Sequence, residues 1–124
     1  MSAAVLCIGT ELTRGEIVNT NASWLAEELT DRGIEVAAIE TIADDRPLIV
    51  ETLHRLSAKH LVIVCTGGLG PTTDDITSEC VAEALGVPLV RDEASLAAIR
   101  TRMEKFGRVM AESNKKQADF PTGA

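Results

Sequence analysis

The most restrictive feature of the sequence is a run of branched apolar residues that leads directly into a glycine-rich loop. The segment His60–Cys65 contains LVIVC, which is typical of a strand buried on both faces. The loop Thr66–Thr77, TGGLGPTTDDIT, follows at once, and apolar residues then recur at helical spacing from Ile76 to Leu85. A strand, a tight loop and a helix in this order predict a βαβ unit and hence parallel strands.

The same alternation runs through most of the chain. Further strands are predicted at Ala3–Ile8, Glu35–Ile42 and, as a short extended piece, Pro88–Val90. Helices are predicted from Asn19 to Gly33, from Asp44 through Leu56, from about Thr73 to Gly86, and from about Asp92 with Leu96, Ile99, Met103 and Phe106 as a core stripe. The prediction is an α/β fold with a mostly parallel, doubly wound sheet and helices on both of its faces.

The composition limits what this fold can do. The 124 residues suit a single domain, residues 1–124, and the scarcity of aromatic residues leaves Val, Leu, Ile and Ala to build its core. A formal net charge of −7 argues against nucleic acid or an anionic membrane as a partner. There is no apolar run of the ~20 residues that a membrane span needs, and the N-terminus lacks the basic region of a signal peptide. We therefore expect a cytoplasmic protein.

The glycine-rich loop is the strongest candidate for a binding site. Gly67, Gly68 and Gly70 let the backbone turn sharply and approach a ligand closely, and the helix that follows would present unpaired N–H groups to an anion. The loop is neither a Walker A sequence nor GxGxxG. Its spacing alone is equally compatible with a phosphate cradle and with a tight structural turn.

Asp74 and Asp75, at the start of the predicted helix, are candidate metal ligands. One aspartate is enough to complement a helix dipole, whereas two beside a phosphate would repel it unless a divalent cation such as Mg²⁺ lay between them. Glu11 follows the first predicted strand and would face them across the crevice if the first and third strands are neighbours. The alternative for Glu11 is a solvated loop carboxylate.

The remaining candidates carry amides, an amine and a thiol. Asn19 and Asn21 are helix caps or reach a ribose or base, and Lys116 neutralises a phosphate or lies on a solvated helix face. Cys65, one of three cysteines, is expected to be a reduced, partly buried thiol; the alternative is a nucleophile beside the glycine loop.

Three segments resemble a known family. GTELTRGEIVNTN (Gly9–Asn21), the glycine-rich loop TGGLGPTTDDIT (Thr66–Thr77) and NKKQADFPTGA (Asn114–Ala124) are similar to the N-terminal domain of the competence/damage-inducible CinA proteins, of the molybdopterin-binding, molybdenum-cofactor biosynthesis fold. The resemblance covers nearly the whole chain and implies a three-layer α/β/α domain.

The resemblance also implies a function. It points to divalent-metal-dependent hydrolysis of ADP-ribose, with two alternatives: binding or adenylyl transfer to molybdopterin, and a non-catalytic binding module for a nucleotide or pterin. The catalytic candidates are Asp74, Asp75 and Glu11; the metal ligands are Asp74 and Asp75; the substrate-binding candidates are Thr66, Gly67, Gly68, Gly70, Thr72, Asn19, Asn21 and Lys116.

The end of the chain carries a further expectation. Gly107–Ala124 is polar and aperiodic, so we predict no terminal element there. Members of the family continue into another glycine-containing loop and a strand. We therefore expect a fold truncated at its C-terminus, which forms homo-oligomers by covering an open edge.

Overall fold

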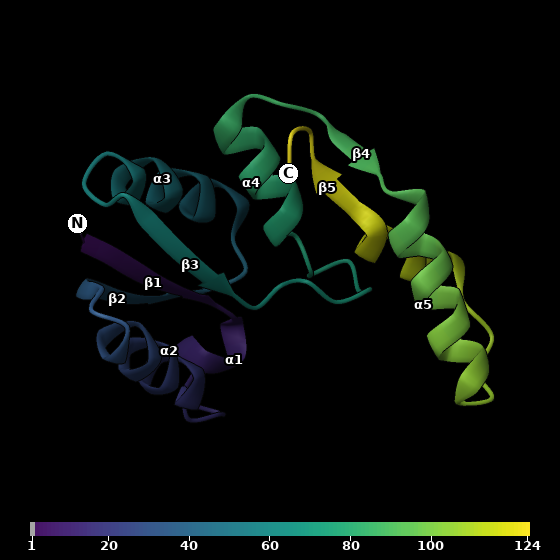
Figure 1. Ribbon diagram of the computed structural model, residues 1–124, viewed down its shortest axis with the longest axis horizontal. Coiled ribbons are helices and arrows are strands. Elements are labelled where there is room, and N and C mark those ends of the chain that lie inside the picture. The colour runs from purple at the N-terminus through teal and green to yellow at the C-terminus, as the bar shows by residue number, and fades with distance from the viewer. Residues whose placement is uncertain (1) are drawn as a thin grey trace.

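Three parallel strands form the centre of the molecule in a computed structural model that describes residues 2–124. The strands are β1 (Ser2–Ile8), β2 (Glu35–Ile42) and β3 (Val62–Thr66), and they pair in the order β2-β1-β3. The helix α2 (Thr20–Asp31) connects β1 to β2, and α3 (Arg46–Ser57) connects β2 to β3. These helices cover opposite faces of the sheet (Figure 1), so the predicted three-layer α/β/α arrangement and doubly wound order are confirmed.

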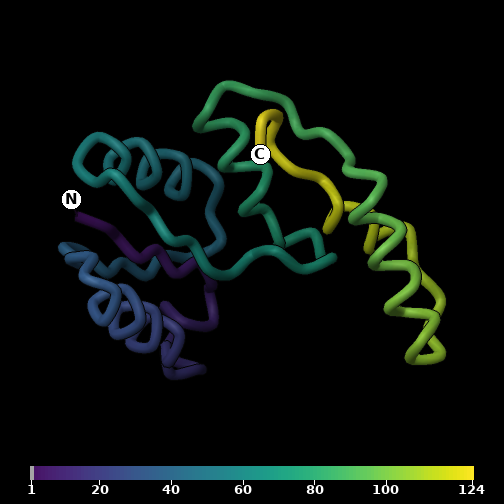
Figure 2. Tube along the Cα trace, in the orientation of Figure 1, coloured from purple at the N-terminus to yellow at the C-terminus, as the bar shows by residue number. Residues whose placement is uncertain are grey.

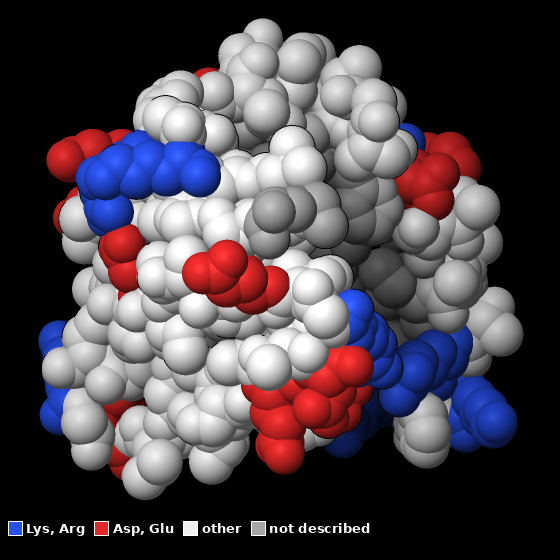
Figure 3. All heavy atoms as spheres, turned by 60° about the vertical axis from the view of Figure 1, so that its left-hand side comes forward, with Lys and Arg blue, Asp and Glu red and all other residues white. Residues whose placement is uncertain are grey.

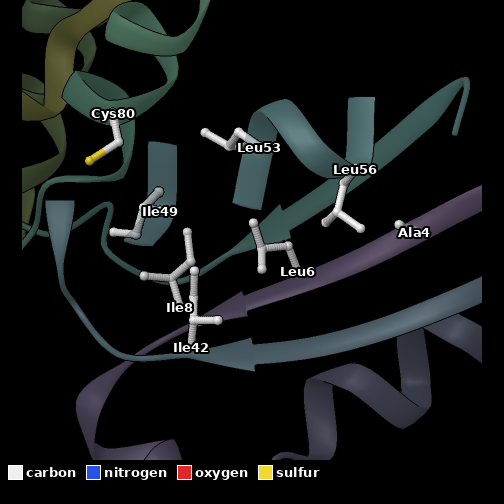
Figure 4. Close-up of a cluster of buried hydrophobic side chains, with 8 residues drawn as sticks. All are labelled: Ala4, Leu6, Ile8, Ile42, Ile49, Leu53, Leu56 and Cys80. Carbon is white, nitrogen blue, oxygen red and sulfur yellow. The ribbon is translucent and has the colours of Figure 1, made fainter. Parts of the chain in front are cut away.

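The central strand β1 supplies both halves of the core. Successive side chains of a strand point to opposite faces, and every residue from Ala3 to Ile8 is buried. Val5 and Cys7 pack with Ala22 of α2. On the other face, Figure 4 shows a cluster formed by Ala4, Leu6, Ile8, Ile42, Ile49, Leu53, Leu56 and Cys80. The core is therefore aliphatic, as the composition predicts.

The second half of the chain is built around a further helix. Its elements are α4 (Thr77–Leu85), β4 (Leu89–Arg91), α5 (Glu93–Lys105), the 3-10 helix η1 (Glu112–Ala118) and β5 (Asp119–Pro121). The short helix α1 (Thr10–Thr13) belongs to the first half, where it follows β1. β4 and β5 pair antiparallel, and β5 packs on α4. α5 packs on η1 and extends away from the three-layer unit, as the trace in Figure 2 shows.

Two of the sequence expectations about burial are wrong. The run LVIVC predicted a strand buried on both faces, yet β3 is half-buried along its length and Leu61 is exposed. β3 lies at one edge of the three-stranded sheet, whereas β1 has a neighbour on each side. In α5, Leu96 is buried as predicted, but Phe106, the residue that caps the C-terminal end of the helix, is 66% exposed. The main contacts of the helix are with η1 rather than with the central sheet.

The expectation that residues 107–124 form no element is also wrong. η1 and β5 occupy this segment, and an ion pair between Arg91 and Asp119 joins β4 to β5, with Nε and Oδ1 2.9 Å apart. A strand of three residues is too short to produce a visible period in the sequence. Its pairing partner is also 28 residues away along the chain, at the Arg91–Asp119 pair, so no local signal predicts the pairing.

Charged side chains of both signs are distributed over the surface. On the face drawn in Figure 3, Lys and Arg occur in separate groups near Asp and Glu, with uncharged surface between them. Among the helices formed by residues 2–124, none has the length and apolarity that crossing a bilayer requires.

Candidate functional site

The carboxyl ends of the three parallel strands meet around one cleft of about 540 Å³. Ligands of open α/β sheets bind at this edge, where the strand order reverses. The segment after β1 contributes Ile8, Gly9, Thr10, Glu11, Arg14 and Glu16; the segment after β2 contributes Asp44; and the glycine-rich loop after β3 contributes Gly68, Thr72, Asp74 and Asp75.

The glycine-rich loop passes so close to β1 that side chains are excluded. Gly67 has a φ of 95°, and a Cβ on it would overlap the backbone carbonyl oxygen of Ile8. Gly68 has a φ of 69°, and its Cβ would overlap the hydroxyl of Thr77. That buried hydroxyl donates to the Gly67 carbonyl at 2.7 Å, which fixes the turn from within. The loop is thus a tight structural turn at the cleft; the phosphate cradle stays a prediction.

Asp75 shapes the loop through its own carboxylate. Oδ2 accepts hydrogen bonds from the Thr72 N–H at 2.9 Å and the Thr72 hydroxyl at 2.8 Å. Desolvation raises the pKa of Asp75, but the hydrogen bonds from Thr72 and Gly70 and the charge of Lys116 outweigh it and hold the pKa below its ordinary value. This turn occupies the residues that the sequence assigned to the first turn of the helix, so α4 begins at Thr77 rather than at Thr73.

The three carboxylates proposed from sequence line the same cleft. Glu11 lies in the first turn of α1, and its carboxylate folds over Gly9, where a Cβ would come within 2.6 Å of Oε1. Asp74 is exposed and next to Asp75. The order β2-β1-β3 makes β1 and β3 neighbours, which is the condition under which the sequence placed Glu11 opposite the aspartates.

Asp44 is a cleft residue that the sequence reasoning assigned only to the start of a helix. Its Oδ2 accepts from the Thr10 N–H at 3.0 Å, and its own N–H donates to the Thr10 hydroxyl at 3.2 Å. The helix cap is Asp45, whose Oδ1 accepts from the Leu48 N–H at 2.9 Å. Only one of two adjacent aspartates can serve as the cap. The sequence therefore contained a signal that one of these two carboxylates has a role other than capping the helix.

The cleft is strongly acidic. Of the described residues that line it, five are acidic and Arg14 is the basic one. Within residues 2–124, no three His, Cys, Asp or Glu side chains are grouped closely enough to hold one ion by themselves. Mg²⁺ is commonly bound by one or two carboxylates together with ligand phosphates and water, so the residues present fit a cation that arrives with a phosphate.

A second cleft of about 250 Å³ adjoins the first. It is lined by Ile8, Glu11, Leu12, Ile17, Val18, Asn19, Thr20, Asn21, Thr66 and Gly67. Asn19 caps α2, since its Oδ1 accepts from the Ala22 N–H at 3.2 Å, and its Nδ2 donates to the Thr41 hydroxyl at 3.1 Å. The cap reading of Asn19 is therefore confirmed, while Asn21 is exposed at the rim of this cleft.

Lys116 lies behind the glycine-rich loop. Its Nζ donates to the backbone carbonyl oxygens of Thr72, at 2.6 Å, and of Asp75. It lines a separate cavity of about 150 Å³, which Gly68 and Gly70 also reach. The amine thus braces the loop through its backbone, and the structure does not bring it into the acidic cleft.

Cys65 also faces away from the clefts. It lines an apolar groove between α3 and α4, and burial, followed by the neighbouring Cys7, raises the pKa of its thiol. A thiol with a raised pKa remains protonated at neutral pH and is a poor nucleophile. The reading of Cys65 as a partly buried, reduced cysteine therefore fits this environment.

Comparison with known proteins identifies the family of this chain. The family model described as "Probable molybdopterin binding domain" matches residues 4–122. The chain belongs to this family. The expected resemblance is confirmed by a CinA-like protein of Anaeromyxobacter sp. (strain K), 45% identical over all 124 residues, and by a putative competence-damage inducible protein of Clostridium botulinum (strain Loch Maree / Type A3), 46% identical over 121 residues. The chain spans 30% of the length of each of these two relatives.

Solved structures agree with this assignment. The protein CinA of Thermoplasma acidophilum, described as of unknown function, has a TM-score of 0.88 and 34% identity, over 98% of this chain and 70% of that chain. The molybdopterin biosynthesis enzyme MoaB of Thermus thermophilus has a TM-score of 0.63 and 28% identity, over 66% of this chain and 53% of that chain. This molybdopterin-binding domain therefore shares its fold with both CinA and MoaB proteins.

Proposed function

We propose that this domain binds a phosphorylated pterin, with the phosphate in the acidic cleft at the carboxyl edge of the sheet. The observation that carries the proposal is the convergence of Glu11, Asp44 and the glycine-rich loop from three different strands on one cleft. Its position at the point where the strand order reverses is where this class of sheet binds ligands. The family description and the similarity to MoaB, a molybdopterin biosynthesis enzyme, support a pterin as the ligand.

The same proposal includes a divalent cation. Five acidic side chains around a phosphate would repel it, so a Mg²⁺-like ion is needed to make binding favourable. We assign Asp74 and Asp75 as its protein ligands. Asp74 is exposed to the cleft, whereas the carboxylate of Asp75 is already held by Thr72, so Asp74 is the more available of the two.

A direct titration tests this proposal. Neopterin phosphate, a simple phosphorylated pterin, is titrated into the protein by calorimetry in Mg²⁺ and again in a chelator. We expect binding in Mg²⁺ and a loss of roughly tenfold or more in affinity in the chelator, equivalent to about 1.4 kcal/mol. Equal affinity in both conditions would show that the cation has no role in binding. The absence of binding in both would overturn the proposed function.

The acidic cleft also favours a second candidate function, the hydrolysis of a phosphoanhydride. A carboxylate–metal site next to a phosphate can orient water and stabilise charge on the phosphoryl oxygens. Water attacking ADP-ribose would release AMP and ribose 5-phosphate, whereas adenylyl transfer from ATP to a pterin phosphate would release pyrophosphate. Incubation with each substrate set in Mg²⁺, followed by detection of AMP or pyrophosphate, separates hydrolysis, adenylyl transfer and binding alone.

A further inference from the structure

We propose that Lys116 is a positioning residue for the acidic cleft: it holds the backbone of the glycine-rich loop so that the carboxylate of Asp74 stays in place for a cation. Neither role predicted from the sequence, a contact with phosphate or a place on a solvated helix face, accounts for these contacts. The inference rests on the proposed function, because Asp74 is assigned there as the more available ligand of the cation. It adds the residue on which the position of that ligand depends.

Asp74 has no side-chain contact that would fix its carboxylate. It is exposed at the cleft, and none of the side-chain hydrogen bonds and ion pairs found within residues 2–124 involves it. The adjacent Asp75 differs, because Thr72 holds its carboxylate. The position of the Asp74 carboxylate therefore depends on the backbone that carries it.

The two hydrogen bonds of Lys116 enclose Asp74 in the loop. Nζ donates to the carbonyl oxygen of Thr72, at 2.6 Å, and to that of Asp75. These carbonyls belong to residues before and after Asp74, so the segment between them is held at both ends. Hydrogen bonds donated by an ammonium group are stronger than those between neutral groups. One side chain thus fixes the stretch of backbone that carries the exposed carboxylate.

The middle of the glycine-rich loop has few other ties to the molecule. Among the hydrogen bonds found in the described part of the chain, those that join residues 69–75 to residues outside the loop both come from Lys116. The bonds between Asp75 and Thr72 stay within the loop and close its turn. The internal bonds therefore give the turn its shape, whereas Lys116 determines where the turn lies relative to the cleft.

The element that carries Lys116 is itself anchored. η1 ends at Ala118, which is fully buried and whose carbonyl oxygen accepts from the Asp92 N–H at 2.8 Å. β5 follows directly, pairs with β4 and packs on α4. An amine on a fixed backbone can fix the loop in turn. The second half of the chain would thus support the site through Lys116, which lines neither cleft.

A double-mutant cycle tests whether Lys116 acts through Asp74. Neopterin phosphate is titrated in Mg²⁺ into the wild type, Lys116→Met, Asp74→Asn and the double variant. We expect Lys116→Met to lower affinity roughly tenfold when Asp74 is present and less than about twofold in the Asp74→Asn background, where the carboxylate to be positioned is gone. Lys115→Met is the matched control and should bind like the wild type, because Lys115 lies on the same helix, pairs with Glu112 at 2.7 Å and lines neither cleft.

Spectra of the ligand-free protein separate positioning from direct contact with the phosphate. In amide proton–nitrogen correlation spectra, Lys116→Met should shift the signals of Thr73 and Asp74, because the loop moves when its carbonyls lose the amine. Lys115→Met should leave these signals in place. Unchanged loop signals in Lys116→Met together with a loss of affinity would indicate a direct contact with the phosphate and would overturn the inference.

The remaining outcomes distinguish this inference from the proposed function. Coupling between Lys116 and Asp74, with shifted loop signals, supports the inference. Losses that multiply in the double variant, or an affinity that Lys116→Met leaves unchanged, overturn it while the proposed function stands. If Lys116→Met does not fold, the shorter polar side chain of Lys116→Gln replaces it, with the same coupling expected and its absence equally decisive. If the wild type does not bind neopterin phosphate, the proposed function fails and this inference fails with it.

Discussion

Gly67 shows how a single residue sets the distance between the glycine-rich loop and β1. Its φ of 95° lies in the region that side chains disfavour, and a Cβ would overlap the Ile8 carbonyl oxygen. Neither problem is relieved by a side-chain rotation, because the opposing atom belongs to the backbone. The sequence indicated a glycine requirement here, but it did not reveal which atom enforces it.

We expect Gly67→Ala to destabilise the fold more than a matched glycine substitution. Gly107→Ala is the control, since Gly107 has a φ of 68° but open space around its Cβ position. Both variants lose roughly 1–2 kcal/mol from the unfavourable φ, and the overlap should add about 1–3 kcal/mol for Gly67→Ala. The free energy of unfolding from urea denaturation measures the difference. Equal losses in the two variants would contradict the close approach.

Asp75 predicts a pH dependence of stability. Because its pKa in the folded protein lies below the ordinary value of 3.8, the ionised carboxylate favours the folded state. That contribution is complete above about pH 4 and is lost as the pH falls through the lower, folded-state pKa. Asp75→Asn should therefore be less stable than the wild type at neutral pH, and the difference should shrink in acid.

The neighbouring residue provides the control for that measurement. Asp74 is exposed, and none of the side-chain hydrogen bonds found within residues 2–124 involves it, so Asp74→Asn is the matched control for replacing an aspartate by asparagine in the same loop. Thermal unfolding followed by circular dichroism from neutral to acidic pH compares the three proteins. A constant difference in stability between the wild type and Asp75→Asn at every pH would contradict this prediction, because it would show that the charge of the carboxylate does not contribute to stability.

At the scale of elements, the sequence predicts best where signals are local. The caps Asn19 and Asp45 and the left-handed Gly86 mark helix ends that the structure confirms. The grouping of Glu11 with Asp74 and Asp75 was also predictable, because parallel strands bring their carboxyl ends to one edge. The start of α4 was not, since the Thr72–Asp75 turn competes with the helix for the same residues.

Three other features could not be predicted for a different reason. The role of Asp44 depends on Thr10, which is 34 residues away, and the strand β5 depends on β4. Lys116 reaches the glycine-rich loop across more than 40 residues of chain. Contacts of this kind leave no period or motif in a single sequence, so only the folded chain reveals them.

The packing of α3 on the sheet supplies a prediction at the element scale. Ile49 is fully buried in the core cluster, whereas the adjacent Leu48 is 38% exposed on the same helix. We expect Ile49→Ala to lower the free energy of unfolding by about 2–5 kcal/mol and Leu48→Ala by under about 1 kcal/mol. Urea denaturation monitored by far-ultraviolet circular dichroism tests both. Similar losses would mean that α3 is not anchored by its inner face.

The whole molecule combines a well-buried three-layer unit with surfaces that remain open. The outer edge of β3 has no strand partner within residues 2–124. Beside it lies an apolar groove of about 220 Å³, whose lining includes Leu53, Ile63, Val81 and Leu85. Leu85, which the sequence placed on the apolar face of its helix, is 66% exposed. An open strand edge next to exposed apolar side chains favours pairing with another chain.

We therefore expect this chain to self-associate through β3 and the groove beside it. Sedimentation equilibrium over a range of concentrations should show dimers or larger species, and Leu85→Lys should shift the equilibrium towards monomer, because a charge would have to be buried at the interface. Val109→Lys is the control: it adds the same charge at a position that is 91% exposed and does not line the groove. A monomer at every concentration would contradict the prediction. Equal effects of the two lysines would show that net charge, which both variants shift from −7 towards zero, governs association rather than the β3 surface.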